Sequence, residues 1–277
     1  QYNRSFLTNR IVYGLCKIHV YEYLFKRLGI QKVIAPSRAN ILCLICAAKK
    51  QNIPIYELQH GITYGETALY SGYRNTDFTP NYFLAFGDTP PCDVYGIEES
   101  KIYNIGWAFQ DYLDKITSDV HVKERDVLII SGPCLTDKIL KVTFILAKDN
   151  PNVSFVVRPH PAEVLTDKHH KMVDACENVE FQDPNINVAM AMKPFQNIIG
   201  ENSTVLYEAL SYGKKVARFC YENFNPRYLT PEDEKCFWKV KDNISFRAFI
   251  DGRVEDKTSM SIYSKFNKEL FMKIYNE

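Results

Sequence analysis

The stretch QNIIGENSTVLYEALSYGKKVARF, residues 196–219, contains the repeating unit from which the fold can be predicted. An apolar segment that ends at Gly200 predicts a strand. A polar turn then leads into a periodic apolar segment, 203–212, which predicts a helix that ends at Gly213. The next apolar segment predicts a second strand. This order of strand, helix and strand indicates a βαβ unit of a parallel sheet.

The same alternation of short strands and helices is predicted on both sides of a polar segment, 117–125, which we interpret as an interdomain linker. The sequence therefore predicts an α/β protein with two Rossmann-like domains that face a cleft. We expect residues 1–118 to form the N-terminal domain and residues 119–277 to form the C-terminal domain with its closing helices. The N-terminal domain is short for this architecture, and the first residue is not Met, so missing N-terminal residues remain an option.

Composition limits the classes of function. The 277 residues carry 34 Lys and Arg against 33 Asp and Glu, a formal net charge of +1, so we expect no nucleic-acid partner. No apolar run approaches the roughly 18 residues of a membrane-spanning helix, and no signal-peptide pattern is present. The eight cysteines are scattered in apolar segments, as is typical of free thiols in a reduced cytoplasm. The pair Cys43 and Cys46 has no partner pair for zinc and falls in a predicted helix.

Ligands of open parallel sheets bind beyond the carboxyl ends of the strands. Three polar clusters follow predicted strands of this chain, and they are residues 59–61 (QHG), residues 158–161 (RPHP) and residues 200–204 (GENST). The first cluster lies in the predicted N-terminal domain, and the other two lie in the C-terminal domain. We therefore treat these clusters as the candidate functional sites.

The third cluster has the chemistry of an anion site. Gly200 permits a tight turn from strand to helix, and Asn202 or Ser203 can cap the helix. The N–H groups of the first turn, with the hydroxyls of Ser203 and Thr204, can then bind a diphosphate. An ordinary capped helix without a ligand is the alternative interpretation.

The second cluster presents a cation and an imidazole on a stiff loop. Arg158 has a planar guanidinium suited to phosphate oxygens. His160 stands between Pro159 and Pro161, which restrict the backbone of the loop. This favours phosphate binding, and a surface loop with a salt bridge is the alternative.

In the first cluster, Gly61 lets the chain turn sharply after the strand, so that His60 can face a cleft and accept a proton from a hydroxyl. Gln59 is suited to position the site. Glu57 is a candidate catalytic carboxylate, although it faces the same side as His60 only if the strand bends at Gln59. The alternative is that His60 caps the next helix or fills a polar gap.

In order and spacing, the segments ELQHG, VVRPHPAE and GENSTVLYEALSYG resemble motifs of the GT-B glycosyltransferases of bacterial capsule and lipopolysaccharide synthesis. The resemblance extends over about residues 53–219. Teichoic-acid glycerophosphotransferases and bacterial sialyltransferases share a related layout. The resemblance implies a glycosyltransferase that moves a sugar from a nucleotide sugar to a hydroxyl of a bacterial surface glycan.

The resemblance also implies roles for individual residues. His60 becomes the catalytic base, Glu208 contacts ribose or sugar hydroxyls, and four residues contact the donor phosphate, namely Arg158, His160, Ser203 and Thr204. The remaining residues of the expected substrate-binding set are Gln59, Gly61 and Asn202.

The implied partners are a nucleotide-sugar donor (CMP-, UDP- or similar) and a glycan or glycolipid acceptor. The sequence contains no D-x-D motif of the kind that holds a metal on the donor diphosphate, and we expect neither a metal nor another cofactor. We expect a cytoplasmic location, and a peripheral association with the inner face of the membrane stays open.

Three other functions remain in view. A nucleotide-sugar epimerase of GT-B-like fold would need further carboxylates around the sugar, and the sequence does not identify them. A CDP-polyol phosphate transferase of the teichoic-acid type would use the same histidines. A non-catalytic binding module would retain the fold alone.

Overall fold

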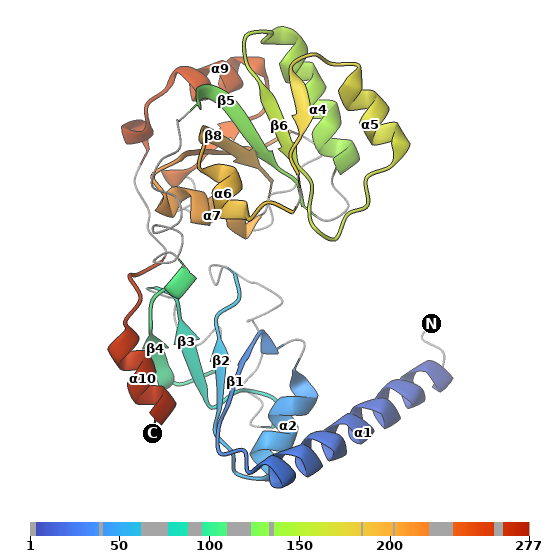
Figure 1. The fold of residues 1–277 in the computed structure, drawn as a ribbon, viewed down its shortest axis with the longest axis vertical. Coiled ribbons are helices and arrows are strands. Elements are labelled where there is room, and N and C mark those ends of the chain that lie inside the picture. The colour runs from blue at the N-terminus through green and yellow to red at the C-terminus, as the bar shows by residue number, and fades with distance from the viewer. Residues whose placement is uncertain are drawn as a thin grey trace. The chain divides into compact units, whose positions relative to one another are not determined.

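The structure is a computed structural model of the chain (Figure 1). It describes residues 4–38, 41–61, 77–87, 96–109, 123–132, 136–183, 185–201, 203–221, 235–257 and 263–276. The chain forms two compact units. Unit 1 comprises Gln1–Trp107 together with Ser264–Glu277, and unit 2 comprises Ala108–Tyr263.

Unit 1 contains a parallel sheet with the strand order β1-β2-β3-β4. Its strands are β1 (Val33–Pro36), β2 (Ile55–Leu58), β3 (Tyr82–Ala85) and β4 (Ile102–Asn104). The register pairs the last residues of β1 and β2, since Pro36 lies opposite Leu58. All four carboxyl ends therefore lie along one edge of the sheet, where the segment that begins at Gln59 leaves β2.

Two helices pack beside the sheet of unit 1, α1 (Arg4–Leu28) and α2 (Leu42–Lys50). Ile18 of α1, Ile45 of α2 and Ile55 of β2 belong to one buried cluster. Only part of α1 contributes to this cluster, and Figure 1 shows its N-terminal portion extending away from the sheet of its own unit. A single-turn 3-10 helix, η2 (Glu99–Lys101), leads into β4.

The last helix, α10 (Lys268–Asn276), packs in unit 1. Ile274 is buried in a cluster with Tyr56, Leu84 and Ile105 from three successive segments of the sheet. The sequence predicts that residues 119–277 form one domain, and the structure differs at this end, because the apolar face of α10 is buried against β2, β3 and the end of β4. The expected boundary near residue 118 lies outside the described residues.

The returning chain passes close to the end of β4. The backbone N–H of Trp107 donates to the carbonyl of Ser264 at 2.9 Å, and Ser264 N donates to Phe86 O at 2.8 Å. Gly106 has φ +71°, and a Cβ built there would lie 2.1 Å from the carbonyl oxygen of Lys265. Position 106 therefore requires glycine for both its backbone conformation and its close approach to the returning segment.

Unit 2 contains a larger parallel sheet with the strand order β10-β9-β8-β5-β6-β7. Its strands are β5 (Lys123–Ile130), β6 (Phe155–Arg158), β7 (Val179–Phe181), β8 (Phe195–Gly200), β9 (Lys215–Phe219) and β10 (Trp238–Val240). β5 begins at Lys123 and so includes the last residues of the segment 117–125 that we expected to be a linker.

The described helices of unit 2 are α4 (Thr136–Asp149), α5 (Asp167–Asp174), α6 (Val188–Met192), α7 (Thr204–Ser211) and α9 (Asn243–Asp251), with the 3-10 helix η3 (Val254–Asp256). Phe155 of β6 stacks on Phe246 of α9, with ring centroids 5.5 Å apart, in a large buried cluster that includes Leu140 of α4. The prediction of an α/β protein with two Rossmann-like domains is confirmed.

Strand order changes direction at the centre of unit 2. From β5 the chain passes through α4 to β6 on one side, and from β8 through α7 to β9 on the other. Because crossovers between parallel strands are right-handed, the two connections place α4 and α7 on opposite faces of the sheet (Figure 1). The loops after β5 and β8 separate at this point, and such a switch point is where open α/β sheets bind ligands.

Candidate functional site

At the switch point of unit 2, the turn from β8 into α7 is closely packed. A Cβ at Gly200 would lie 3.0 Å from the carbonyl oxygen of Ile130 and 3.1 Å from Leu206 Cδ2. Glycine at this position lets β8 lie against β5 while the chain turns into α7. Asn202, one of the expected substrate-binding residues, lies outside the described residues.

Ser203 is the N-cap of α7, and its Oγ accepts a hydrogen bond from the backbone N–H of Val205 at 3.3 Å. Thr204 is the first residue of the helix. A Ser cap satisfies one of the N–H groups that an α-helix leaves without an internal partner in its first turn. The geometry is that of a capped helix, and it also suits an anion at the positive end of the helix.

The N-terminus of α4, on the other side of the switch point, is already occupied by a carboxylate. The backbone N–H of Thr136 donates to Glu163 Oε1 at 3.2 Å, and its hydroxyl donates to Glu163 Oε2. Glu163 belongs to the loop that follows His160, and its own N–H donates to His160 O at 2.9 Å. The α7 terminus is therefore the better anion site of the two, and Glu163 ties the loop after β6 to α4.

His160 is half-buried, and its ring orientation is set by its own loop. The backbone N–H of Ala162 donates to His160 Nδ1 at 3.1 Å. In the neutral ring the proton is then on Nε2, which can donate a hydrogen bond to a ligand oxygen. His160 thus stands at the carboxyl edge of the sheet as a donor, as the expected contact with phosphate requires.

Arg158 is buried at the end of β6, and its guanidinium contacts the segment after β7. Nη1 donates to Gln182 Oε1 at 3.0 Å and to Asp183 O at 3.3 Å, and Nη2 donates to Ile186 O at 2.6 Å. Burial lowers the pKa of Arg158, an effect that the Asp183 carboxylate opposes. Arg158 therefore orders the connection between β7 and α6, an internal role that sequence reasoning did not include.

Glu208 lies one turn into α7 and is partly buried. Burial raises the pKa of its carboxyl group to about 7, well above the ordinary value of 4.5. A carboxyl group whose charge changes near neutral pH is uncommon, and such groups often occur in functional sites. Its position on the α7 helix is compatible with the expected contact to ribose or sugar hydroxyls.

Arg218, which sequence reasoning did not identify, is almost fully buried at the end of β9, opposite Gly200 in register. Its Nη2 donates to the hydroxyl of Tyr207 at 2.6 Å, and its guanidinium lies 4.5 Å from the centroid of the Phe237 ring. This stack fastens α7 to β9 behind the Ser203 cap. The one sequence signal was an arginine within an apolar strand.

In unit 1, Gln59 holds the turn that carries His60. Gln59 is buried, and its Oε1 accepts a hydrogen bond from the N–H of Phe86, at the end of β3, at 2.7 Å. Its Nε2 donates to Gly61 O at 2.9 Å. Gly61 has φ +78°, a conformation that favours glycine. The backbone of His60 is therefore fixed on both sides, while its ring is exposed.

Glu57 is fully buried in an ion pair with Arg38, the second residue after β1. Its two oxygens accept hydrogen bonds from Arg38 N at 2.7 Å and from Arg38 Nε at 2.8 Å. Burial raises the pKa of Glu57, and Arg38 opposes the change. The pair links the end of β1 to β2.

Ser37 lies between β1 and this ion pair and was also missed from the sequence. It has φ +55°, a left-handed conformation unusual for serine, and it is buried. Its hydroxyl makes no hydrogen bond with a described residue. Strained residues of this kind concentrate at functional sites. Ser37 lies beside the turn that follows β2, so its conformation supports a functional site at this edge of the sheet.

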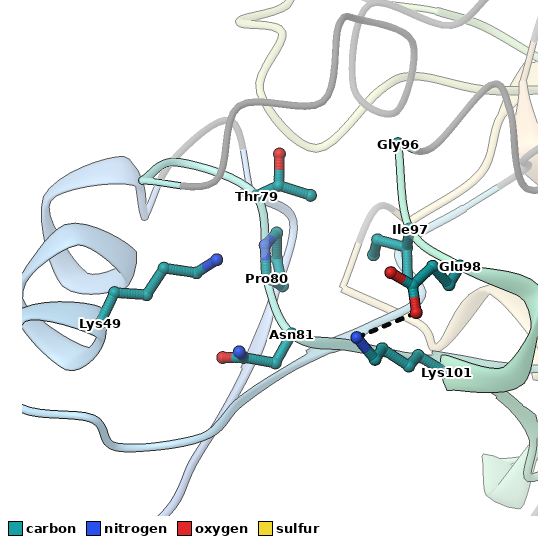
Figure 2. A pocket seen from close by; sticks show the side chains of 8 residues that line it. All are labelled: Lys49, Thr79, Pro80, Asn81, Gly96, Ile97, Glu98 and Lys101. Carbon is teal, nitrogen blue, oxygen red and sulfur yellow. Dashed lines mark ion pairs between the residues drawn. The ribbon is translucent and has the colours of Figure 1, made fainter.

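A small pocket occurs at the opposite, amino-terminal edge of the sheet of unit 1 (Figure 2). It is lined by Lys49, Thr79, Pro80, Asn81, Gly96, Ile97, Glu98 and Lys101. Its volume is about 60 Å³, and Lys101 Nζ pairs with Glu98 Oε2 at 3.1 Å. Sites for small organic ligands usually measure roughly 300–1,000 Å³, so this pocket is too small for a nucleotide sugar.

The structure thus brings Glu57, Gln59, His60 and Gly61 together at one edge in unit 1. In unit 2 it brings Arg158, His160, Ser203 and Thr204 to the carboxyl edge, with Glu208 on α7. Within the described ranges, no group of three or more His, Cys, Asp or Glu side chains is arranged to hold a metal ion.

Two units with parallel sheets and polar residues at their carboxyl edges define the GT-B fold, and comparison with solved structures agrees. UDP-GlcNAc 2-epimerase from Neisseria meningitidis bound to UDP-GlcNAc aligns with a TM-score of 0.62 and 15% identity, over 95% of this chain and 81% of that one. MurG from Acinetobacter baumannii aligns with a TM-score of 0.53 and 15% identity, over 94% and 77% of the chains.

The wall teichoic acid polymerase TagF aligns with a TM-score of 0.50 and 10% identity, over 98% of this chain and 95% of that one. At these identities the likeness shows the fold and nothing finer. No protein-family model matches the sequence, and no curated protein matches it significantly.

Proposed function

We propose that the protein is a metal-independent glycosyltransferase that moves a sugar from a nucleotide sugar to a hydroxyl of a bacterial surface glycan, in capsule or lipopolysaccharide synthesis. The observation that carries the proposal is the exposed imidazole of His60 on a turn fixed by Gln59 and Gly61. A base on a fixed turn at the end of a buried strand is suited to accept the proton of an acceptor hydroxyl.

Unit 2 binds the donor in this proposal. The diphosphate lies at the N-terminus of α7 with Ser203 and Thr204, and His160 Nε2–H donates to it. Arg158 holds the loop that follows β7 and adds positive potential to this edge. Glu208 contacts ribose or sugar hydroxyls. That a structure of the same fold binds UDP-GlcNAc supports a nucleotide sugar, whether UDP-, CMP- or similar.

The chemical step follows from these roles. His60 removes the proton from the acceptor hydroxyl, and the oxygen forms a bond to the anomeric carbon of the sugar. The bond between that carbon and the donor phosphate oxygen breaks, and its electron pair leaves with the nucleotide. The helix terminus and His160 stabilise the negative charge that develops on the departing phosphate.

An epimerase is the second candidate, because several structures with the same fold are UDP-GlcNAc 2-epimerases. Glu57 supplies the carboxylate among the described residues at the carboxyl edge of unit 1. Its side chain is buried and paired with Arg38. Epimerisation needs accessible groups that remove and return a proton at the sugar carbon, and the buried Glu57 is not suited to this role. Incubation with a nucleotide sugar and no acceptor separates the two, because an epimerase converts the sugar without an acceptor.

A CDP-polyol phosphate transferase is a third candidate, supported by the alignment with TagF over nearly the whole of both chains. A thermal-shift panel of CMP, UDP, GDP and CDP with their sugar and glycerol conjugates tests all three. A sugar nucleotide that stabilises the chain more than its free nucleotide supports the transferase. Stabilisation by CDP-glycerol alone favours the polyol phosphate enzyme, and no stabilisation by any compound contradicts nucleotide binding.

We also propose that the reaction occurs in the cytoplasm at the inner face of the membrane, where a glycolipid acceptor is accessible. None of the described helices is long and apolar enough to cross a bilayer. The association that we propose is attachment of the protein to the surface of the membrane.

A further inference from the structure

Helix α1 exposes an unusual amount of apolar surface. Ten of its large apolar side chains are exposed, namely Phe6, Leu7, Ile11, Val12, Tyr13, Leu15, Val20, Tyr23, Leu24 and Leu28. Ile18 and Phe25, by contrast, are buried against the body of unit 1. Large exposed apolar surfaces on a protein often mark interaction sites.

A stripe of this helix faces away from the body. Phe6, Tyr13 and Val20 recur every seven residues and are 45%, 60% and 55% exposed, respectively. With 3.6 residues per turn, these positions lie on one face, on the side away from Ile18 and Phe25. Four further residues share this face, and they are Arg10, Lys17, Leu24 and Arg27. We call these seven residues the outer stripe.

Cations and aromatic rings alternate along the outer stripe. The Arg10 guanidinium lies 5.1 Å from the centroid of Phe6, and Lys17 Nζ lies 4.7 Å from that of Tyr13. Basic side chains can extend their charge toward lipid headgroups while their stems and the neighbouring rings contact the acyl boundary. This combination of basic and aromatic side chains suits the interface of a bilayer, where water and headgroups lie on one side and acyl chains on the other.

The charge of α1 is one-sided. The helix has five basic residues and one acidic residue, Glu22, whereas the whole chain has a formal net charge of only +1. Glu22 is on the body side, where Lys50 Nζ pairs with its Oε1 at 3.1 Å. The outer stripe therefore has no acidic residue, and it is complementary to an anionic surface and repelled by a second copy of itself.

We propose that the outer stripe of α1 docks the protein on an anionic lipid bilayer. The stripe lies in the plane of the interface, with Phe6, Tyr13, Val20 and Leu24 at the acyl boundary. Arg10, Lys17 and Arg27 contact anionic headgroups. This inference rests on the membrane attachment proposed above and assigns it to α1, and its test is separate from that of the reaction because it measures binding to lipid and requires no turnover.

The test is co-sedimentation of the full chain with vesicles of phosphatidylcholine alone and of phosphatidylcholine with phosphatidylglycerol in a 3:1 ratio. We expect binding to the anionic vesicles, loss of that binding as salt is raised, and little binding to the neutral vesicles. Two double variants should each reduce partitioning at least tenfold. One combines Arg10→Glu with Lys17→Glu, and the other combines Tyr13→Ser with Val20→Ser.

Helix α4 offers matched controls, since Lys141 and Lys148 are exposed seven residues apart and Ile145 is 57% exposed between them. Lys141→Glu with Lys148→Glu, and Ile145→Ser, should leave partitioning unchanged. Equal losses in the α4 variants contradict the proposal, as does the absence of binding to anionic vesicles at low salt. A dimer in sedimentation equilibrium that the Tyr13→Ser and Val20→Ser changes dissociate would assign the stripe to a second copy and overturn the proposal.

Discussion

The side-chain amide of Gln59 donates to the carbonyl of Gly61 at 2.9 Å and so closes a hydrogen-bonded ring around the backbone of His60. The same side chain accepts the N–H of Phe86 at 2.7 Å, which fastens the turn to the end of β3. The backbone from which the imidazole projects is therefore fixed with respect to the sheet. If His60 is the base, Gln59 is its positioning residue.

Replacing Gln59 with Glu should keep the hydrogen bond from Phe86 and remove the one to Gly61. The carboxylate still accepts from Phe86 N–H, but it faces the carbonyl of Gly61 without a proton to donate. We expect kcat to fall about 10- to 100-fold, as a displacement of about 1 Å can cause, with unchanged affinity for the donor nucleotide. Steady-state kinetics and calorimetry measure the two quantities.

The control is Gln196→Glu, because Gln196 Nε2 also donates to a glycine carbonyl, that of Gly213, at 3.4 Å, but in unit 2. It should leave kcat unchanged. A Gln59→Glu variant with wild-type kcat would show that the turn positions nothing.

His60→Asn should remove the proposed base while keeping a polar side chain of similar size. Loss of a general base typically costs a factor of about 10²–10⁴ in rate. We therefore expect transfer to fall by this factor, while nucleotide binding, which we assign to unit 2, stays the same. His170→Asn, at an exposed position on α5, is the control. Transfer at the wild-type rate by His60→Asn, with donor bound normally, excludes the base assignment.

The ion pair of Glu57 with Arg38 should stabilise unit 1. Glu57→Gln leaves a mostly buried guanidinium without its counter-charge, and we expect a loss of about 3–5 kcal/mol in the stability of unit 1. Glu57→Gln combined with Arg38→Met should restore part of the loss. Urea unfolding in a Trp238→Phe background measures it, because the only other tryptophan, Trp107, belongs to unit 1.

The exposed pair of Lys168 with Asp137, at 2.9 Å, serves for comparison. Asp137→Asn, followed in a Trp107→Phe background because the pair lies in unit 2, should change stability little, because exposed ion pairs contribute weakly to folding. If Glu57→Gln is no worse than Asp137→Asn, the buried pair does not stabilise unit 1. A loss of turnover in Glu57→Gln without a loss of stability would support the catalytic role expected from the sequence.

The pKa of Glu208 predicts a pH dependence of stability. Burial raises it from 4.5 to about 7, so between these values the folded chain keeps a proton that the unfolded chain releases. Stability should therefore fall as pH rises from 4.5 to 7, by up to about 3 kcal/mol. Glu208→Gln should be more stable than wild type at pH 8 and equal to it near pH 4.5. Urea unfolding in a Trp107→Phe background, which keeps Trp238 of unit 2, measures this difference.

Glu180→Gln, at an exposed position of β7, should follow the wild type at both pH values. If Glu208→Gln also follows the wild type, Glu208 ionises as an ordinary surface carboxyl group.

The local pattern of apolar and polar residues explains why the strands, and the candidate site residues at their ends, could be predicted from the sequence. Short apolar segments that end at Leu58, Arg158 and Gly200 indicated strands, because each is followed by a cluster of polar, proline or glycine residues. The positions of His60, Ser203 and their neighbours at strand ends follow directly from that order. Chain topology then determines which strand ends share an edge.

Contacts between distant segments were not predictable in this way. The apolar face of α10 can pack on any sheet, and only the assembled chain shows that it covers Tyr56 and Leu84. The hydrogen bonds of Thr136 to Glu163 and of Arg218 to the Tyr207 hydroxyl depend on the order of strands in the sheet. Charged residues in these places look like surface residues until their partners are known.

Gly200→Ala tests whether close packing at the switch point matters for both folding and binding. The added Cβ would meet Ile130 O of β5 at 3.0 Å and Leu206 Cδ2 of α7 at 3.1 Å, so these neighbours must give way by a few tenths of an ångström. We expect a loss of about 1–3 kcal/mol in the stability of unit 2, the usual cost of overpacking, and weaker nucleotide binding at the displaced helix terminus. Urea unfolding and calorimetry measure these effects.

Gly14→Ala is the matched control, since a Cβ there would meet only Cys43 Sγ, at an ordinary 3.9 Å, in the middle of α1. Because alanine is the better helix former, this variant should gain up to about 1 kcal/mol and bind nucleotide normally. If Gly200→Ala loses stability but keeps its nucleotide affinity, the β8–α7 turn is needed for packing and the donor phosphate does not bind at this helix terminus. Loss of both would support the assignment of the donor site to α7.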